Sequence, residues 1–279
     1  MLNAVKYNKY EMEKIYAKKS LGQNFLKSKK ALLTMIEVGK ISSSDIVLEI
    51  GPGQGALTEK LLESGAKIIA VEKDNRLIDL LDEKFENEIN SKQLEIIHGD
   101  ILELDLSKKL RANSYKLIAN IPYYITGQIF RKFLSGTLQP EKIVILVQKE
   151  IADRIVAHDK KESLLSLSVK VYGKAKKIMK VGKENFSPRP KVDSAILLID
   201  DISKNFFEGI GEESFFEIIK AGFAHKRKVL ISNLRDFAKK GNGADLKTAF
   251  SSLKISEKAR AEDLTLEDWK KLIKSLIFS

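Results

Sequence analysis

The sequence of 279 residues contains no cysteine. This absence excludes disulfide bonds and thiolate metal sites. Histidine is also scarce: His98, His158 and His225 are scattered along the chain, so we expect no histidine-based metal centre. No apolar run is long enough to span a bilayer, and the first residues lack the apolar core of a signal peptide. We therefore expect an intracellular, cytoplasmic protein with no membrane partner.

Charge of one sign is in excess. The chain has 49 Lys and Arg against 38 Asp and Glu, which gives a net charge of +11. Such an excess can simply keep a protein in solution, or it can attract a polyanion such as nucleic acid. Lysines crowd the amino-terminal end, and residues 1–17 are expected to form a loose basic arm. Composition alone leaves both interpretations open.

Short apolar runs alternate with helical patterns along most of the chain. The runs with strand character are residues 45–50, 66–72, 94–100, 115–120, 142–148, 176–181 and 192–199. Uniformly apolar strands that alternate with helices are typical of a mostly parallel sheet that is buried on both faces. A helical pattern covers about 75–87, and from about residue 200 the chain is helical throughout, with patterns near 212–224, 226–239, 244–252 and 266–277. The sequence thus predicts an α/β fold with a seven-stranded, mostly parallel, Rossmann-like sheet over 18–203, and a small all-α domain over 204–279.

Glycines and acids stand at the ends of three consecutive strands. The first strand leads into "GPGQG", which contains Gly51 and Gly53, the second ends at Glu72, and the third ends at Asp100. Glycines allow backbone N–H groups to approach a ligand, and parallel sheets bind ligands at the carboxyl ends of their strands. Glu72 suits a ribose diol, Asp100 suits an adenine amino group, and Ile101 could pack on the adenine ring.

The glycine spacing separates this loop from two common nucleotide sites. G-x-G-x-G differs from the G-x-G-x-x-G of dinucleotide folds, and no G-x-x-x-x-G-K-[ST] is present. A lone glycine loop is more often an ordinary turn, and a lone acid is more often a solvated loop residue. All three features together favour a pocket for an adenosine without a phosphate tail. S-adenosylmethionine is therefore the predicted cofactor.

The fourth strand ends in "KLIANIPYYITG". Proline cannot continue a central strand, so Pro122 indicates that the strand stops at Asn120. Methyl transfer to an exocyclic adenine amine requires the nitrogen lone pair to be drawn out of conjugation with the ring. The Asn120 side-chain oxygen and the Ile121 carbonyl could both accept from the amine, with Pro122 fixing the carbonyl and Tyr123 stacking on the purine. The alternative is a capping asparagine beside a core tyrosine.

Several motifs together resemble the ribosomal RNA adenine N6-dimethyltransferases. They are "SLGQNFL", "EIGPGQGALTEKL", "AVEKD", "GDIL", "NIPYYIT", "QKEIADRIVA" and "FSPRPKVDSAIL". The resemblance runs from about Lys18 to Leu198 and continues weakly over residues 222–234. It implies a Rossmann-like, S-adenosylmethionine-dependent methyltransferase that dimethylates adenosines of ribosomal RNA.

Two branches of that family differ in their substrate. "PKVDSAIL" and "FAHKRKVLISNL" look more like the KsgA-type branch, which modifies two adjacent adenosines near the 3′ end of small-subunit (16S) rRNA during ribosome assembly. The Erm-type branch modifies one adenosine of large-subunit (23S) rRNA, and a non-catalytic RNA-binding assembly factor on the same scaffold is a third alternative. We expect a KsgA-type monomer that acts on a 30S assembly particle.

The resemblance also implies roles for individual residues. Tyr123 and Phe186 would sandwich the target adenine, and Tyr124 stands where the family usually has Asn or His, which implies a subtly altered fit to the substrate. Donor contacts are implied for Asn24, Leu26, Gly51, Glu72, Asp100 and Asn120. The cations expected to contact the RNA backbone are Lys18, Lys19, Arg189, Lys191, Lys226, Arg227 and Lys228.

Overall fold

The computed structural model describes residues 17–110, 114–240 and 245–277. The predicted basic arm, residues 1–17, lies outside these residues except for its last position. None of the helices in this described part of the chain is long and apolar enough to cross a membrane.

The chain divides into two compact units. The first reaches as far as Lys149 and resumes over Lys177–Asp200, and the second comprises Glu150–Lys176 and the chain from Asp201 onward. The predicted domain boundary between residues 203 and 204 stays a prediction. It differs from this grouping because it assigns Glu150–Lys176 to the first domain.

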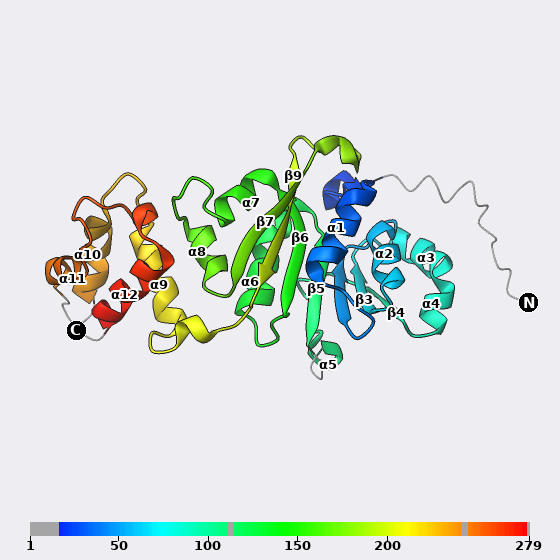
Figure 1. Ribbon diagram of the computed structural model, residues 1–279, viewed down its shortest axis with the longest axis horizontal. Helices are drawn as coiled ribbons and strands as arrows, with labels where there is room; N and C mark the ends of the chain where they lie inside the picture. The colour runs from blue at the N-terminus through cyan, green and yellow to red at the C-terminus, as the bar shows by residue number, and fades with distance from the viewer. Residues whose placement is uncertain (1–16, 111–113, 241–244, 278–279) are drawn as a thin grey trace, which may run out of the picture. The chain divides into compact units, whose positions relative to one another are not determined.

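A seven-stranded sheet forms the centre of the first unit. Its order is β4-β3-β2-β5-β6-β9-β7 (Figure 1). The pairs β2–β3, β3–β4, β2–β5 and β5–β6 are parallel, and β6–β9 is antiparallel. The predicted seven-stranded, mostly parallel sheet is therefore confirmed. The strands are β2 (Ile46–Ile50), β3 (Lys67–Glu72), β4 (Leu94–His98), β5 (Tyr115–Asn120), β6 (Lys142–Gln148), β7 (Lys174–Val181) and β9 (Ser194–Asp200).

The strand order reverses direction between β2 and β5. The chain adds β3 and β4 on one side of β2 and then returns to place β5 on its other side. Such a reversal opens a crevice at the carboxyl ends of the two central strands, where parallel sheets bind their ligands. The ends of β2 and β5 are the "GPGQG" loop and Asn120.

Capping side chains set where several helices of this unit begin. The Ser28 hydroxyl accepts from the Ala31 N–H at the start of α1, and Asp74 accepts from the Arg76 N–H at the start of α3. The helices are α1 (Lys29–Gly39), α2 (Ala56–Glu63), α3 (Asn75–Lys84), α4 (Glu86–Asn90), α5 (Ser107–Leu110) and α6 (Thr126–Ser135).

The helix predicted over 75–87 is divided at Phe85. This residue leaves helical geometry with φ −118°, so the chain forms α3 and α4 instead of one helix. Phe85 is buried, and a Cβ at Gly55 would come within 2.5 Å of its ring. The position of the Phe85 ring therefore depends on Gly55, in the loop between β2 and α2. Local periodicity does not reveal such a contact.

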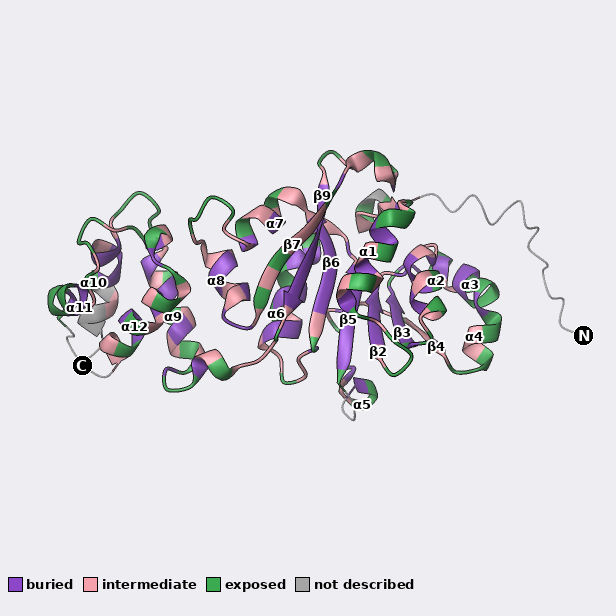
Figure 2. Cartoon of the chain, in the orientation of Figure 1, coloured by how far each residue is buried: buried purple, intermediate pink, exposed green. Residues whose placement is uncertain are grey.

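The sheet strands supply most of the buried apolar surface. Figure 2 shows β2, β3, β5, β6 and β9 as almost continuously buried, whereas the helices alternate buried and exposed positions. Side chains of α1, α2 and α3 join those of the strands in one hydrophobic core. This pattern explains why the strands are uniformly apolar in the sequence.

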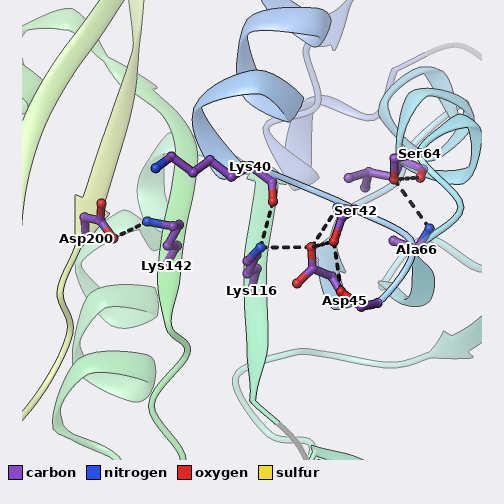
Figure 3. A network of polar contacts seen from close by, with 10 residues as sticks. Lys40, Ser42, Asp45, Ser64, Ala66, Lys116, Lys142 and Asp200 are labelled. Carbon is purple, nitrogen blue, oxygen red and sulfur yellow. Dashed lines mark hydrogen bonds and ion pairs between the residues drawn. The ribbon is translucent and has the colours of Figure 1, made fainter.

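One lysine is buried at the start of β5. The Lys116 ammonium donates to the Lys40 carbonyl at 2.8 Å and to the Asp45 carboxylate at 2.9 Å (Figure 3). Asp45 also accepts from the Ser42 N–H and hydroxyl. Burial alone would raise the pKa of Asp45, but the bonds from Lys116 and Ser42 outweigh it and hold that pKa below its usual value. This network joins α1, β2 and β5 at the end of the sheet opposite the crevice.

The second unit is built from helices. Tyr172 donates to Glu212 at 2.5 Å, and the Lys161 ammonium contacts Glu262 at 2.6 Å, so both contacts join Glu150–Lys176 to the later helices. The predicted helix over 226–239 starts later, because His225–Lys228 forms a turn. The helices are α7 (Lys149–Ile155), α8 (Leu164–Lys170), α9 (Glu212–Gly222), α10 (Leu230–Lys240), α11 (Leu246–Ser252) and α12 (Leu266–Ile277).

Candidate active site

A cavity of about 360 Å³ lies at the carboxyl ends of β2, β3, β4 and β5. A volume of this size suits a nucleoside-sized ligand. The structure brings together the predicted cofactor and catalytic residues, apart from Phe186, around this single space. They are Asn24, Leu26, Gly51, Gly53, Glu72, Asp100, Ile101, Asn120, Ile121, Pro122 and Tyr123.

The glycine loop has a left-handed backbone. Gly51 and Gly53 have φ of +67° and +60°, which side chains rarely adopt. A Cβ at Gly53 would lie 3.0 Å from the Phe25 ring, so that ring is held directly against the loop. A Cβ at Gly51 would meet only the Asn120 carbonyl, at 3.9 Å. Gly51 therefore leaves open space in front of the loop, as a ligand in close approach to its backbone requires.

Glu72 is fixed by backbone donors at the end of β3. The Gly53 N–H donates to its Oε2 at 3.1 Å, and the Asp74 N–H donates to its Oε1 at 2.8 Å. Burial raises the pKa of Glu72, while these N–H groups act in the opposite direction. Each carboxylate oxygen has a further lone pair, so the two oxygens can still accept from a pair of hydroxyl groups.

Asp100 has an ion-pair partner that the sequence did not reveal. Lys73 contacts its Oδ2 at 2.6 Å, and the Leu102 N–H donates to its Oδ1 at 2.9 Å. The Lys73 ammonium holds the pKa of Asp100 below its usual value despite partial burial. Because the Lys73 side chain is half exposed, it can move away from Asp100 Oδ2 and leave that oxygen free to accept from a ligand.

Lys132 fixes the loop that follows Asp100. Its ammonium donates to the carbonyls of Leu102 and Leu104 at 3.3 Å and 2.7 Å. Lys132 belongs to α6, so this contact ties the Asp100 side of the cavity to the helix that follows the Asn120 turn. Nothing in the sequence indicated this contact of Lys132, because its acceptors are backbone carbonyls, which every residue carries.

The Asn120 amide is oriented by the amino-terminal segment. Its Nδ2 donates to the Asn24 carbonyl at 3.1 Å, and Asn24 in turn donates to the Gly22 carbonyl at 3.1 Å. This contact uses the donor side of the Asn120 amide, so Oδ1 is the group available to accept from an amine. Pro122 follows with φ −57° and ψ 134°, and Ile121 between them is buried.

Tyr123 is anchored by a distant strand. Its hydroxyl lies 2.6 Å from the Ser194 Oγ at the start of β9, and Ser194 is fully buried. Burial raises the pKa of Tyr123, and the bond to Ser194 partly offsets this effect. The phenol is therefore neutral at physiological pH and presents a fixed aromatic ring to the cavity.

Gln23 links the amino-terminal segment to β3. Its Nε2 donates to Asp74 Oδ2 at 2.8 Å, and its Oε1 accepts from the Lys18 N–H at 2.7 Å. Asp74 also accepts from Arg76, which lowers the pKa of Asp74 to about 2. Since the Asp74 N–H holds Glu72, one chain of hydrogen bonds runs from Gln23 to the carboxylate at the end of β3. Gln23 lies inside "SLGQNFL", where only Asn24 and Leu26 were singled out.

Phe186 is the predicted catalytic residue that the structure does not bring to the cavity. Its ring is only 4% exposed and belongs to the hydrophobic core together with Leu26. The cause is the antiparallel pairing of β8 (Phe186–Ser187) with β1 (Phe25–Leu26), which places Phe186 opposite Leu26. Neither short strand was predicted from the sequence. In this structure Phe186 packs against the amino-terminal segment.

The predicted RNA-contacting cations are exposed wherever their side chains are described. Lys18, Arg189 and Lys191 are exposed in the first unit, and Lys226, Arg227 and Lys228 are exposed in the second. The Lys19 side chain lies outside the described part of the structure. None of these residues lines the cavity.

The donor set of the cavity fits S-adenosylmethionine. Two backbone-fixed carboxylates face it from β3 and β4, and an open glycine backbone and an oriented amide complete its rim. Three or more metal-binding side chains do not cluster anywhere among residues 17–110, 114–240 and 245–277. The chemistry supported here is binding of a nucleoside beside an amide acceptor and an aromatic ring.

Comparison with solved structures supports this fold. A dimethyladenosine transferase from Plasmodium falciparum superposes with a TM-score of 0.74 at 28% identity, covering 89% of this chain and 95% of that one. The 23S rRNA methyltransferase ErmE gives a TM-score of 0.75 at 24% identity over 91% of this chain and 100% of that one. The second likeness supports the fold alone.

Comparison of sequences supports the predicted family. A ribosomal RNA small subunit methyltransferase A from Dehalococcoides mccartyi is 42% identical over 260 residues, covering 92% of this chain and 87% of that protein. A protein of the same name from Fusobacterium nucleatum is 40% identical over 264 residues, covering 92% and 96%. The family described as ribosomal RNA adenine dimethylase matches residues 15–277. The predicted fold and cofactor are confirmed, and the chain belongs to this family of S-adenosylmethionine-dependent methyltransferases.

Proposed function

We propose that this protein dimethylates N6 of two adjacent adenosines near the 3′ end of small-subunit (16S) rRNA during ribosome assembly. It would act in the cytoplasm, as a monomer, on a 30S assembly particle. The observation that carries the proposal is the Asn120 amide, which the Asn24 carbonyl orients inside the cavity that Glu72 and Asp100 also line. The small-subunit names of the relatives favour this substrate over large-subunit rRNA.

The donor half of the site would be held by fixed acceptors. Glu72 would accept from the ribose hydroxyls, because both of its oxygens are positioned by backbone N–H groups. Asp100 would accept from the adenine amine of the donor in place of Lys73. When bound, S-adenosylmethionine supplies a methyl carbon on a cationic sulfur, and the carbon–sulfur electron pair returns to sulfur as the nitrogen–carbon bond forms.

The acceptor half would prepare the target amine. Asn120 Oδ1 and the Ile121 carbonyl would accept its two hydrogens and so direct the nitrogen lone pair out of the ring plane. Tyr123, anchored by Ser194, would stack on the purine and hold it at the correct height. The surplus proton leaves nitrogen for water after methyl transfer, so no strong base is required. Catalysis then consists mainly of orientation and fixed dipoles.

The test is Asn120→Ala. We expect the variant to bind S-adenosylmethionine with little change in calorimetry but to lose about 100-fold or more of methyl transfer to unmodified small-subunit particles. Asn90→Ala, at the exposed end of α4, is the matched control. Turnover of Asn120→Ala equal to that of the wild type would refute the proposed role.

The same assay separates the alternatives. Mass-spectrometric mapping that finds dimethyladenosine in large-subunit rRNA, and none in small-subunit rRNA, would support Erm-type activity. Donor and RNA binding without any transfer by the wild-type protein would support an assembly factor. The exposed cations predict that log affinity for RNA falls linearly with log salt concentration, and a flat response would argue against contacts with the RNA backbone.

A further inference from the structure

Tyr124 is an exposed aromatic side chain at the cavity. Large exposed hydrophobic side chains in the described part of the chain are Leu33, Tyr124 and Val192, and Tyr124 is the most exposed of them at 60%. Of these three, Tyr124 alone lines the cavity. Its neighbour Tyr123 is half-buried and hydrogen-bonded, so the two consecutive rings have different environments. An exposed ring at the edge of a binding cavity is a candidate contact for a ligand.

The Tyr124 ring is held in place on one side. A Cβ added to Gly22 would lie 3.2 Å from two of its ring carbons and 3.4 Å from the Pro122 Cβ. Gly22 also has a φ of +61°, which a residue with a side chain would rarely adopt. The ring thus packs directly on the Gly22 backbone, which restricts its motion. A ring that is already ordered loses less entropy when it binds a partner.

We propose that Tyr124 is a stacking site for a second base, the nucleobase of the RNA nucleotide next to the one being methylated. This inference rests on the proposed function of the same site. A base that is flipped into a pocket leaves its neighbour without a stacking partner, and an aromatic side chain can replace it. Tyr123 and Tyr124 stand on one short turn behind Pro122, so a single rigid segment offers one ring inside the cavity and one at its rim.

The surroundings of Tyr124 favour RNA over a role as a cover for the donor. The donor half is already bordered by the segment of Asn24, whose carbonyl is bonded to Asn120. Lys27 and Lys73 are exposed cations that line the same cavity and can approach phosphates beside the stacked base. The net charge of +11 has the sign that an RNA partner requires.

The experiment compares Y124A, Y124L and Y124F with the wild type. Methyl transfer is measured on unmodified small-subunit particles, and donor affinity is measured by calorimetry with S-adenosylmethionine. We expect Y124A and Y124L to raise the KM for particles by about 5- to 150-fold, the range for one stacked base. Y124F keeps the ring and is expected to stay within about twofold of the wild type. L33A, an exposed apolar residue of α1 outside the cavity, is the matched control.

A spectroscopic readout reports stacking directly. An RNA oligonucleotide carrying 2-aminopurine beside the target adenine should lose fluorescence on binding to the wild type and Y124F, but not to Y124A. Equal KM values and equal quenching for the wild type and Y124A would overturn the inference, as would a change in donor affinity with unchanged KM. The proposed function is tested separately, by methyl transfer from the wild-type protein to small-subunit rRNA. The role of Tyr124 is tested by the KM values of the variants relative to the wild type and by the quenching of 2-aminopurine.

Discussion

Glu49 leads to a prediction about stability and pH that the structure makes quantitative. This residue, on β2 just before the glycine loop, is 1% exposed, and neither of its carboxylate oxygens has a hydrogen-bond partner. Burial is the largest effect and raises the pKa of Glu49 from 4.5 to about 8, and the nearby Glu72 carboxylate adds to the rise. The perturbation is Glu49→Gln, which keeps the shape of the side chain and removes its ionisation.

The magnitude follows from proton linkage. The folded state binds the Glu49 proton more tightly than the unfolded state, so this group's contribution to stability is largest below pH 4.5 and declines as the pH rises to about 8. The pKa of Glu49 is raised from 4.5 to about 8, and each pKa unit corresponds to about 1.4 kcal/mol. The stabilisation lost as the pH rises through this range is therefore about 5 kcal/mol. As the pH rises from 4.5 to 9, the free energy of unfolding of Glu49→Gln should therefore increase by about 5 kcal/mol relative to that of the wild type.

The assay is urea denaturation of both proteins at intervals from pH 4.5 to pH 9. A buried glutamine amide without partners carries its own desolvation cost, but that cost does not vary with pH, so the difference between the proteins isolates the ionisation. Glu83→Gln, at an exposed position of α3, controls for the change in net charge. A difference between wild type and Glu49→Gln that stays constant across this range would refute the reasoning.

Four further variants test three contacts found in the structure. Lys116→Met leaves the partly buried Asp45 carboxylate without its lysine partner and should cost about 3 kcal/mol in urea denaturation, and a loss below about 0.5 kcal/mol would contradict the role of this pair. Ser194→Ala and Tyr123→Phe should each slow methyl transfer without weakening donor binding, with a coupling of about 1 kcal/mol in a double-mutant cycle; strictly additive effects would exclude the proposed anchoring. Lys132→Met frees two loop carbonyls and should weaken S-adenosylmethionine binding by about tenfold in calorimetry, and unchanged affinity would show that the loop holds its place without it.

Much of the fold could be predicted because its signals are local. Apolar runs marked the central strands β2, β3, β5, β6 and β9, and α12 begins and ends where its helical pattern did. Parallel strands bring their carboxyl ends to one edge, so the positions of Gly51, Glu72, Asp100 and Asn120 followed once the strands were placed.

Other features were not predictable because they depend on residues far apart in the chain. The Ser194 contact that anchors Tyr123 spans 71 positions, and nothing in either local pattern indicates it. Phe186 is in the core because a two-residue strand pairs it with Leu26, and so short a strand leaves no periodicity to detect. Lys132 acts on backbone carbonyls, which look alike in every sequence.

The sequence by itself determined the order of strands and helices and the kinds of groups at each strand end, because apolar periodicity and turn residues act over a few neighbouring positions. Only the tertiary structure decided which way those groups face and what holds them. The Asn24 carbonyl accepts from the Asn120 amide and so orients it, and the Lys73 ammonium forms an ion pair with Asp100. Gly22, which has no side chain, leaves space for the Tyr124 ring. These contacts arise when separate segments pack together, and their geometry is fixed by that packing rather than by any one stretch of the chain.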